Sequence, residues 1–295
     1  MLAATVPLPT ELRILLRSLG QIVLQANAAT GACVLAALAC TGLPAACAAL
    51  LGATAANVVA HLAGHDRAEG RQGLHGFNGA LAALAAVGFS ADASTGFGLA
   101  LLAASLAGWA CGPIGGWLRT RGLCAYSSPC LAVTACWLPF HAAAPHAGGA
   151  PGWTLGDALG GGCAGVAQAA FAQGIPAGLW MLLGLAAASR RAATFAFGGA
   201  LAGSLALVAL GAPDTDAVAL RAGLLGFNGA LTALALAGRG VPTAAVGVAM
   251  AVLAQWFALR AGLTVLTLPF VLATWLTLVA RRTTDGILNV LRTPR

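Results

Sequence analysis

The chain has 295 residues, of which 59% are hydrophobic and only 8% are charged. Soluble domains average roughly 45–50% and about 25% on these two measures, so this chain has too few charged groups to cover a water-soluble surface. Its net charge of +7 comes from arginines at the edges of apolar runs rather than on one face. The composition predicts an integral membrane protein and excludes soluble enzymes, nucleic-acid binders and disordered proteins.

Ten apolar runs follow one another, in two sets of five. A span needs about 20 residues to cross roughly 30 Å of hydrocarbon, so the longest runs have room for a helix pair. The runs lie near 20–51, 53–64, 74–90, 96–118, 123–140, 158–188, 192–211, 218–237, 241–259 and 261–280. Residues 141–156, rich in Pro and Gly, separate the two sets. No cleavable signal peptide is visible, so the first run is expected to remain as a span.

Three sequence segments occur twice, in the same order. The clearest pair is GLHGFNGALAALA at 73–85 and GLLGFNGALTALA at 223–235, at an offset of 150. The other pairs are LCAYSSPC at 123–130 with LTVLTLPF at 263–270, and GQIVLQANAATG at 20–31 with AQAAFAQGIPAG at 167–178. This order predicts a tandem duplication. Chance likeness between helices rich in Ala and Gly stays open as an alternative, most of all for the last pair.

The duplication predicts an all-α polytopic membrane protein made of two repeats. The first repeat is expected to span 1–145, a linker 146–156, and the second repeat 157–295. If each repeat holds an odd number of spans, the two lie inverted in the bilayer. A permeation pathway is then expected at the repeat interface, near the middle of the membrane.

The ionisable residues of the chain avoid the middle of the apolar runs. All eight acids lie at or near run ends, whereas ion-coupled transporters usually keep an ionisable group within the membrane. The interior polar residues are neutral: Gln21, Gln25, Asn27, Asn78, Ser127, Ser128, Gln168, Asn228 and Thr267. This inventory favours passive conduction of a neutral solute that forms hydrogen bonds.

The repeated FNGAL segment places an aromatic and a leucine four residues apart. In a helix these positions share one face, so Phe77 with Leu81, and Phe227 with Leu231, would each form a stripe. Such a stripe lines a pathway or, equally well, packs against lipid or a neighbouring helix. Both interpretations remain open from the residues alone.

The polar and small residues of the same segment have a different predicted role. Asn78 and Asn228 are expected to satisfy backbone groups at a broken helix end, as irregular backbone requires at membrane depth. Gly79 and Gly229 are expected to allow close approach of a neighbouring backbone.

A proline follows a hydroxyl residue in each copy of the last pair. Pro129 and Pro269 are expected to free a carbonyl one turn upstream, and Ser127 and Thr267 to offer hydroxyl groups to a pathway. The alternative is that these hydroxyls bond back to their own helix.

The eight cysteines show no CxxC pairing and mostly sit inside apolar runs. This pattern disfavours a zinc or iron–sulfur site and predicts small thiols packed between helices, so no metal and no cofactor is expected.

With these segments together, the chain resembles the urea transporters, the channel-like proteins of bacteria and animals. The duplicated FNGAL segments, LTVLTLPF and the elements GQIVL and AQAAF carry the resemblance over both halves. It implies two inverted repeats of about five transmembrane helices, each with a pore-directed half-helix. It also implies a homotrimer with one pore per subunit, in a bacterial inner membrane, and no enzymatic activity.

The resemblance also implies a set of pore residues. Phe77 and Leu24 would form one slot for planar urea, and Phe171 and Phe227 the other. Gln21 and Gln168 would offer side-chain oxygens at the two slots, and Ser127 and Thr267 would mark the middle. The apolar walls would be Leu81, Leu231, Ile22 and Ala169.

The first half departs further from the family pattern than the second. Leu24 stands where an aromatic ring is usual, Ser127 replaces Thr, and Cys130 replaces Phe. Cys124 and Thr264 replace the usual proline in the two LP elements. A channel for a short amide, ammonia or water is therefore the alternative function. A membrane enzyme would need clustered catalytic groups within the spans, and a purely structural protein would not explain the paired polar elements.

Overall fold

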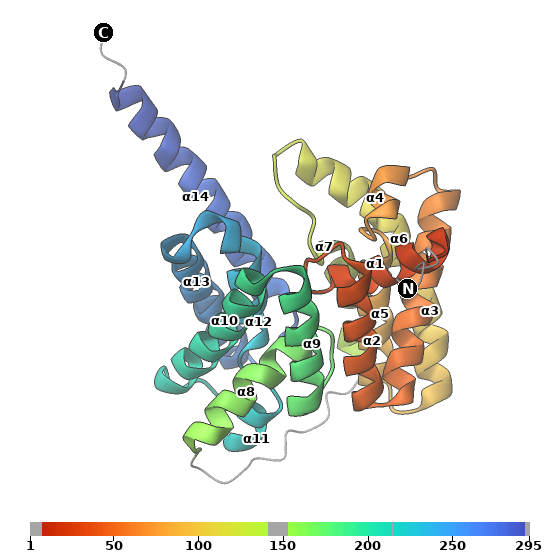
Figure 1. Ribbon diagram of the computed structural model, residues 1–295, viewed down its shortest axis with the longest axis horizontal. Helices are drawn as coiled ribbons and strands as arrows, with labels where there is room; N and C mark the ends of the chain where they lie inside the picture. Colours follow the sequence, from red (N-terminus) through yellow and green to blue (C-terminus); the bar gives the residue numbers. More distant parts are fainter. Residues whose placement is uncertain (1–7, 141–152, 214, 293–295) are drawn as a thin grey trace, which may run out of the picture. The chain divides into compact units, whose positions relative to one another are not determined.

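The computed structural model describes residues 8–140, 153–213 and 215–292, and within them every regular element is a helix (Figure 1). The first half contains α1 (Thr10–Gln21), α2 (Ala28–Thr41), α3 (Leu43–Leu62), α4 (Arg67–Arg71), α5 (Gly76–Phe89), α6 (Ala93–Arg119), α7 (Ser128–Trp137) and the 3-10 turn η1 (Leu138–Phe140). The second half contains α8 (Leu155–Gln168), α9 (Gly174–Ala188), α10 (Arg190–Ala209), α11 (Ala217–Arg221), α12 (Phe227–Leu236), η2 (Ala237–Arg239), α13 (Val241–Arg260) and α14 (Leu268–Arg292). The predicted linker falls largely on residues 141–152, which lie outside the described part.

The turns of the two halves match at the offsets of the sequence pairs. Gly73 and Gly223 precede α5 and α12 with φ of +81° and +79°. Gly122 and Gly262 end the turns after α6 and α13, both with φ of +66°. Glycine adopts this left-handed backbone at little cost, which explains the residue type at each turn.

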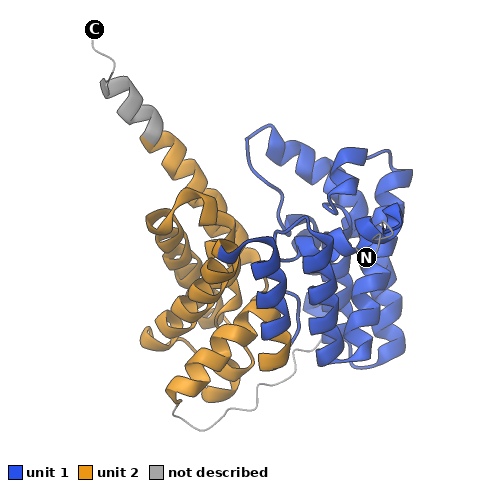
Figure 2. Cartoon of the chain, viewed as in Figure 1, with its two compact units in different colours: residues 1–142, 170–172, 179–190 blue, residues 143–169, 173–178, 191–295 orange. Residues whose placement is uncertain are grey.

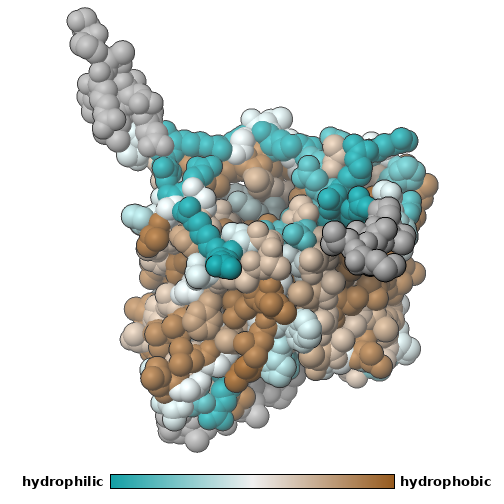
Figure 3. Space-filling view, viewed as in Figure 1, coloured by the Kyte–Doolittle hydropathy of each residue, from teal (hydrophilic) through white to brown (hydrophobic). Residues whose placement is uncertain are grey.

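In the part of the chain that the structure describes, four helices are long and apolar enough to cross a membrane: α3, α6, α10 and α13. Shorter apolar helices include α2, α5 and α9. Large apolar side chains on these helices are exposed, among them Leu102, Trp109 and Phe257. The visible surface over α8 and α10 is mostly hydrophobic (Figure 3). An exposed apolar surface of this extent is typical of helices that face lipid.

The chain divides into two compact units (Figure 2). Unit 1 consists of residues 1–142, 170–172 and 179–190, and unit 2 of residues 143–169, 173–178 and 191–295. In unit 1, α3, α5 and α6 pack against one another, and in unit 2, α12 packs against α13 and α14.

Small residues form the core of each unit. In unit 1, Ala49, Ala53 and Ala56 of α3 are fully buried. In unit 2, a cluster around Leu207 and Leu220 is supplemented by further Ala and Val side chains. Small side chains let helices approach closely, which is how helices pack in a membrane where apolar burial alone does not drive association.

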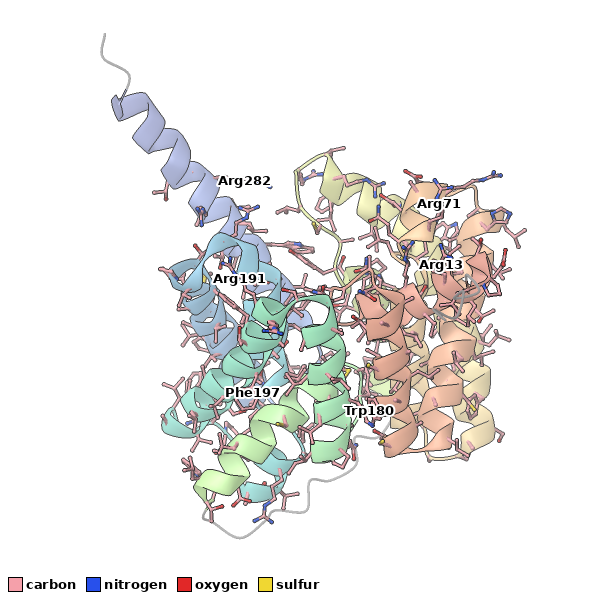
Figure 4. All side chains as sticks on the ribbon, viewed as in Figure 1. Arg13, Arg71, Trp180, Arg191, Phe197 and Arg282 are labelled. Carbon is pink, nitrogen blue, oxygen red and sulfur yellow. The ribbon has the colours of Figure 1, made fainter. Side chains whose placement is uncertain are left out.

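Charged and capping residues lie at the helix ends. Asn27 accepts hydrogen bonds at the start of α2, and Thr154 with Asp157 forms a capping box at the start of α8. Some arginines lie at helix ends, for example Arg71 on α4 and Arg191 on α10 (Figure 4), whereas Arg281 and Arg282 lie within α14.

Candidate functional site

The turn after α1 holds three of the predicted site residues. Gln21 is the last residue of α1, and its side-chain nitrogen donates to the Gln72 carbonyl oxygen at 3.1 Å. Ile22 is buried, and Leu24 adopts φ of +57°. A left-handed backbone costs a non-glycine residue about 1–2 kcal/mol, so this turn holds Leu24 in a strained position.

The turn after α8 repeats this geometry 147 residues later. Phe171 also adopts φ of +57°, and Ala169 is buried. The Gln168 side-chain oxygen is buried and has no hydrogen-bond partner. An unpaired buried acceptor costs about 1–3 kcal/mol, so this oxygen favours a solute that brings an N–H or O–H donor.

The ring of Phe171 packs in unit 1. It meets Phe89 edge to face, with ring centroids 6.4 Å apart and an interplanar angle of 88°. Phe227 belongs to unit 2, so the slot predicted from Phe171 and Phe227 stays a prediction. Leu24 and Phe77 both belong to unit 1, and their slot is likewise a prediction.

The two Phe–Leu stripes lie on buried helices. Phe77 and Leu81 of α5 are 5% and 4% exposed, and Phe227 and Leu231 of α12 are 6% and 3% exposed. The helical spacing assumed for the stripes is therefore observed, because each pair lies within one helix. Burial of this degree fits both packing and a narrow pathway.

The predicted close approach at the glycines is confirmed. A Cβ atom on Gly79 would collide with the Gly52 carbonyl of α3, and a Cβ atom on Gly229 would collide with the Gly199 carbonyl of α10. In each unit, two helix backbones are thus in direct contact at a glycine two residues after the candidate Phe.

The predicted role of the asparagines is also confirmed. The Asn78 side chain donates to the Tyr126 carbonyl at 3.2 Å and accepts from the Cys130 N–H at 3.0 Å. In unit 2, Asn228 donates to the Leu266 carbonyl at 3.2 Å.

Asn228 completes the same pattern by accepting from the Phe270 N–H at 3.1 Å. We call this arrangement of one donated and one accepted bond the asparagine clamp. In both units it satisfies a carbonyl before a helix, α7 or α14, and an N–H in the first turn of that helix, groups that have no partner within the helix.

The hydroxyl residues directly precede α7 and α14, of which α7 is short with 10 residues and α14 is long with 25. Ser127 is the residue before α7 and is 4% exposed, and Thr267 is the residue before α14. Pro129 lies in the first turn of α7, so the prediction of a carbonyl freed one turn upstream within a helix is wrong. Proline at this position only lacks an N–H that would be unpaired in any case.

The Ala125 carbonyl, four residues before Pro129, is engaged locally. It accepts from the backbone N–H of Ser128 at 3.0 Å and from the Ser128 hydroxyl at 2.6 Å. This bond is made by Ser128, and the back-bonding considered for Ser127 and Thr267 stays an alternative.

A charged cluster lies beside the start of α5. The His75 ring stands 3.5 Å from the Glu69 carboxylate, which also pairs with Arg119, and 5.3 Å from the His65 ring. Burial lowers the pKa of His75, and His65 lowers it further against the opposing effect of Glu69. Among the described residues, no group of three or more His, Cys, Asp or Glu side chains is placed to hold a metal ion.

A protein-family model described as urea transporter matches residues 12–282, which includes both halves and both clamps. The chain belongs to the urea transporter family. Urea transporters are transport proteins, and the apolar helices make this member a multi-pass membrane protein. Comparison with curated proteins gave no match.

Two buried side chains beside the asparagines of this urea transporter were missed by the sequence argument. Gln255, 2% exposed on α13, contacts the Asn228 side chain, and Cys111 lies beside the corresponding asparagine, Asn78. A complete census of polar residues in the apolar runs would have included Gln255, because it is the one Gln in the run 241–259. No signal distinguishes Cys111 from the other cysteines.

Proposed function

We propose that the chain is a passive channel for urea, with its pore between two inverted repeats at 1–145 and 157–295. As the family implies, the channel would be a homotrimer in a bacterial inner membrane, with one pore in each subunit. Residues 146–156 would link the repeats.

The asparagine clamps are the observation that carries this proposal. Residues 123–127 and 263–267, which precede α7 and α14, are not helical. Non-helical backbone at membrane depth is stable only where protein groups satisfy it or where it lines a cavity. The clamps satisfy the Tyr126 and Leu266 carbonyls, and backbone that needs this support at membrane depth favours a pathway along these two segments.

The neutral character of the spans supports conduction without ion coupling. Helices α3, α6, α10 and α13 contain no Asp or Glu. Hydrated ions would lose their water without compensation in such a pathway, whereas urea needs only hydrogen bonds. The unpaired oxygen of Gln168 is one such acceptor.

The proposed pathway uses the aromatic slots as its filter. Planar urea would pass between Phe77 and Leu24, and between Phe171 and Phe227, with Gln21 at the first slot. Aromatic faces accept a flat amide group and exclude bulkier solutes.

Stopped-flow measurements on proteoliposomes test the proposal. We expect saturable or linear urea flux down its gradient that does not change when proton and sodium gradients are dissipated. Flux that collapses with either gradient contradicts a passive channel. Acetamide, ammonia and water are measured in parallel, and a higher permeability for one of them than for urea identifies the alternative solute.

A further inference from the structure

Gln255 connects three segments of unit 2. Its side-chain oxygen accepts from the Asn228 side-chain nitrogen at 3.0 Å, and its side-chain nitrogen donates to the Leu224 carbonyl at 3.1 Å. Asn228 in turn holds the backbone on both sides of Thr267. The resulting chain of hydrogen bonds runs from the turn before Phe227, through α13, to the start of α14.

Two proposed pore residues lie between residues that take part in these hydrogen bonds. Phe227 is enclosed by Leu224 and Asn228 along the sequence, and Thr267 by Leu266 and Phe270. On each side of Phe227 and of Thr267, a residue one to three positions away is therefore linked by hydrogen bonds to Gln255, either directly or through Asn228.

The described part of unit 1 has only a weaker form of this connection, through Cys111 of α6. The Cys111 sulfur lies 4.0 Å from the Leu74 carbonyl, the counterpart of Leu224 at the offset of 150. A thiol is a weak donor, so Cys111 fills the place of Gln255 without a comparable hydrogen bond. The Asn78 clamp thus stands without the carboxamide that supports Asn228.

We propose that Gln255 is a positioning residue for urea conduction, and this inference rests on the proposed function. Its side-chain oxygen fixes the nitrogen side of the Asn228 carboxamide toward α13. The Asn228 oxygen is thereby left to receive the Phe270 N–H. Rotation of that carboxamide by half a turn would place two oxygens together and break three bonds, so Gln255 holds both Phe227 and Thr267 in place.

The Gln255→Glu variant tests this role because its effect depends on pH. A protonated carboxyl keeps both bonds, since its O–H donates to the Leu224 carbonyl and its other oxygen accepts from Asn228. An ionised carboxylate has no donor and loses the bond to Leu224. The two ends of the pH range therefore compare the presence and the absence of one hydrogen bond at the same side chain.

Urea flux is measured between about pH 5 and about pH 9 and divided by the flux of the unaltered protein at the same pH. We expect a ratio near one at low pH and a reversible fall of about five- to tenfold at high pH. The Gln255→Leu variant is expected to show the low flux at every pH. Cys111→Ser, the matched change in unit 1, is expected to alter the flux less than about twofold.

The outcomes separate this inference from the proposed function. Absence of urea flux in the unaltered protein contradicts the proposed function. Urea flux that is normal in the unaltered protein and also in Gln255→Leu overturns the role of Gln255. If Gln255→Leu does not assemble, the Gln255→Glu profile decides: a ratio that stays low at both pH extremes, or does not recover on return to low pH, overturns it.

Discussion

The starts of α7 and α14 have the same backbone hydrogen bonds but different surroundings. Asn78 and Asn228 make the same donated and accepted bonds. The residues around them differ: Ser127, Cys130 and Cys111 in unit 1, and Thr267, Phe270 and Gln255 in unit 2. A buried N–H and carbonyl need a partner of fixed geometry, whereas apolar space can be filled in many ways. The clamp is therefore the invariant part of the two sites.

Removal of the clamps is expected to give the largest effect. Asn228→Leu keeps the side-chain size but leaves the Phe270 N–H, the Leu266 carbonyl and Gln255 without their partner. We expect a loss of about 4 kcal/mol in the free energy of unfolding and no urea flux, against about 3 kcal/mol for Asn78→Leu, which leaves fewer groups unpaired. Thermal unfolding in mild detergent measures the difference, and equal losses would contradict the added role of Gln255.

The glycine contacts are expected to behave alike in the two units. Gly52→Ala and Gly199→Ala each introduce a methyl group against a backbone carbonyl of the facing helix. Overpacking of this kind costs about 1–3 kcal/mol, and the two losses should agree within about 0.5 kcal/mol. Gly98→Ala is the control, because a Cβ atom there meets nothing within 4 Å. Helix propensity favours alanine over glycine, so Gly98→Ala should be neutral or stabilising. A control as destabilised as the two variants would show that their losses do not come from the helix contacts.

Substitutions of the residues in the two proposed aromatic slots are expected to change the selectivity between urea and other amides. Phe227→Ala should reduce the preference for urea over acetamide several-fold, since an aromatic contact is worth about 1 kcal/mol. Leu24→Phe restores a ring to the other slot and should increase discrimination against bulkier amides at some cost in flux. Permeability ratios from liposomes decide, and unchanged ratios in Phe227→Ala would make this ring a packing residue.

The hydroxyl groups are expected to have a smaller effect. Thr267→Val preserves the shape and removes one hydrogen-bonding group, so urea flux should fall about two- to fivefold without ion leakage. Ser127→Ala should produce a similar or smaller fall. Flux measured beside membrane conductance tests both variants, and an increase in conductance would indicate a collapsed structure instead.

The smallest expected difference is a pH dependence of stability confined to unit 1. His75 has Leu225 as its counterpart, and burial lowers the His75 pKa below its ordinary value. The unfolded chain therefore binds a proton more readily, so stability is full above the ordinary pKa of about 6.5 and declines as the pH falls below it. His75→Leu should remove this decline in melting temperature between about pH 7.5 and about pH 5. A decline that persists in the variant assigns it to other groups.

The sequence was most informative where hydrogen bonding left little choice. Asn78 and Asn228 stand in the middle of repeated apolar segments, and a carboxamide there needs backbone partners, which the structure shows. The close contacts of Gly79 and Gly229 were predictable for a second reason: a repeated glycine within an apolar helix indicates close approach of another backbone.

Other features were not readable from residue type. The left-handed backbone at Leu24 and Phe171 was not predictable, because neither leucine nor phenylalanine prefers it. Pro129 suits the first turn of a helix as well as a kink, and only the structure distinguishes the two. Gln255 has no repeated counterpart, so pairing of the two halves could not reveal it.

The N-termini of α7 and α14 also affect the electrostatic potential in the proposed pathway. α7 begins at Ser128 and α14 at Leu268, directly after Ser127 and Thr267. The backbone dipoles of a helix sum to roughly half a positive charge at its N-terminus. In the proposed pathway, each of these ends would attract the carbonyl oxygen of a neutral amide and repel ammonium, protons and metal cations. The same backbone that the asparagines hold in place would let a cell take up urea without dissipating its membrane potential.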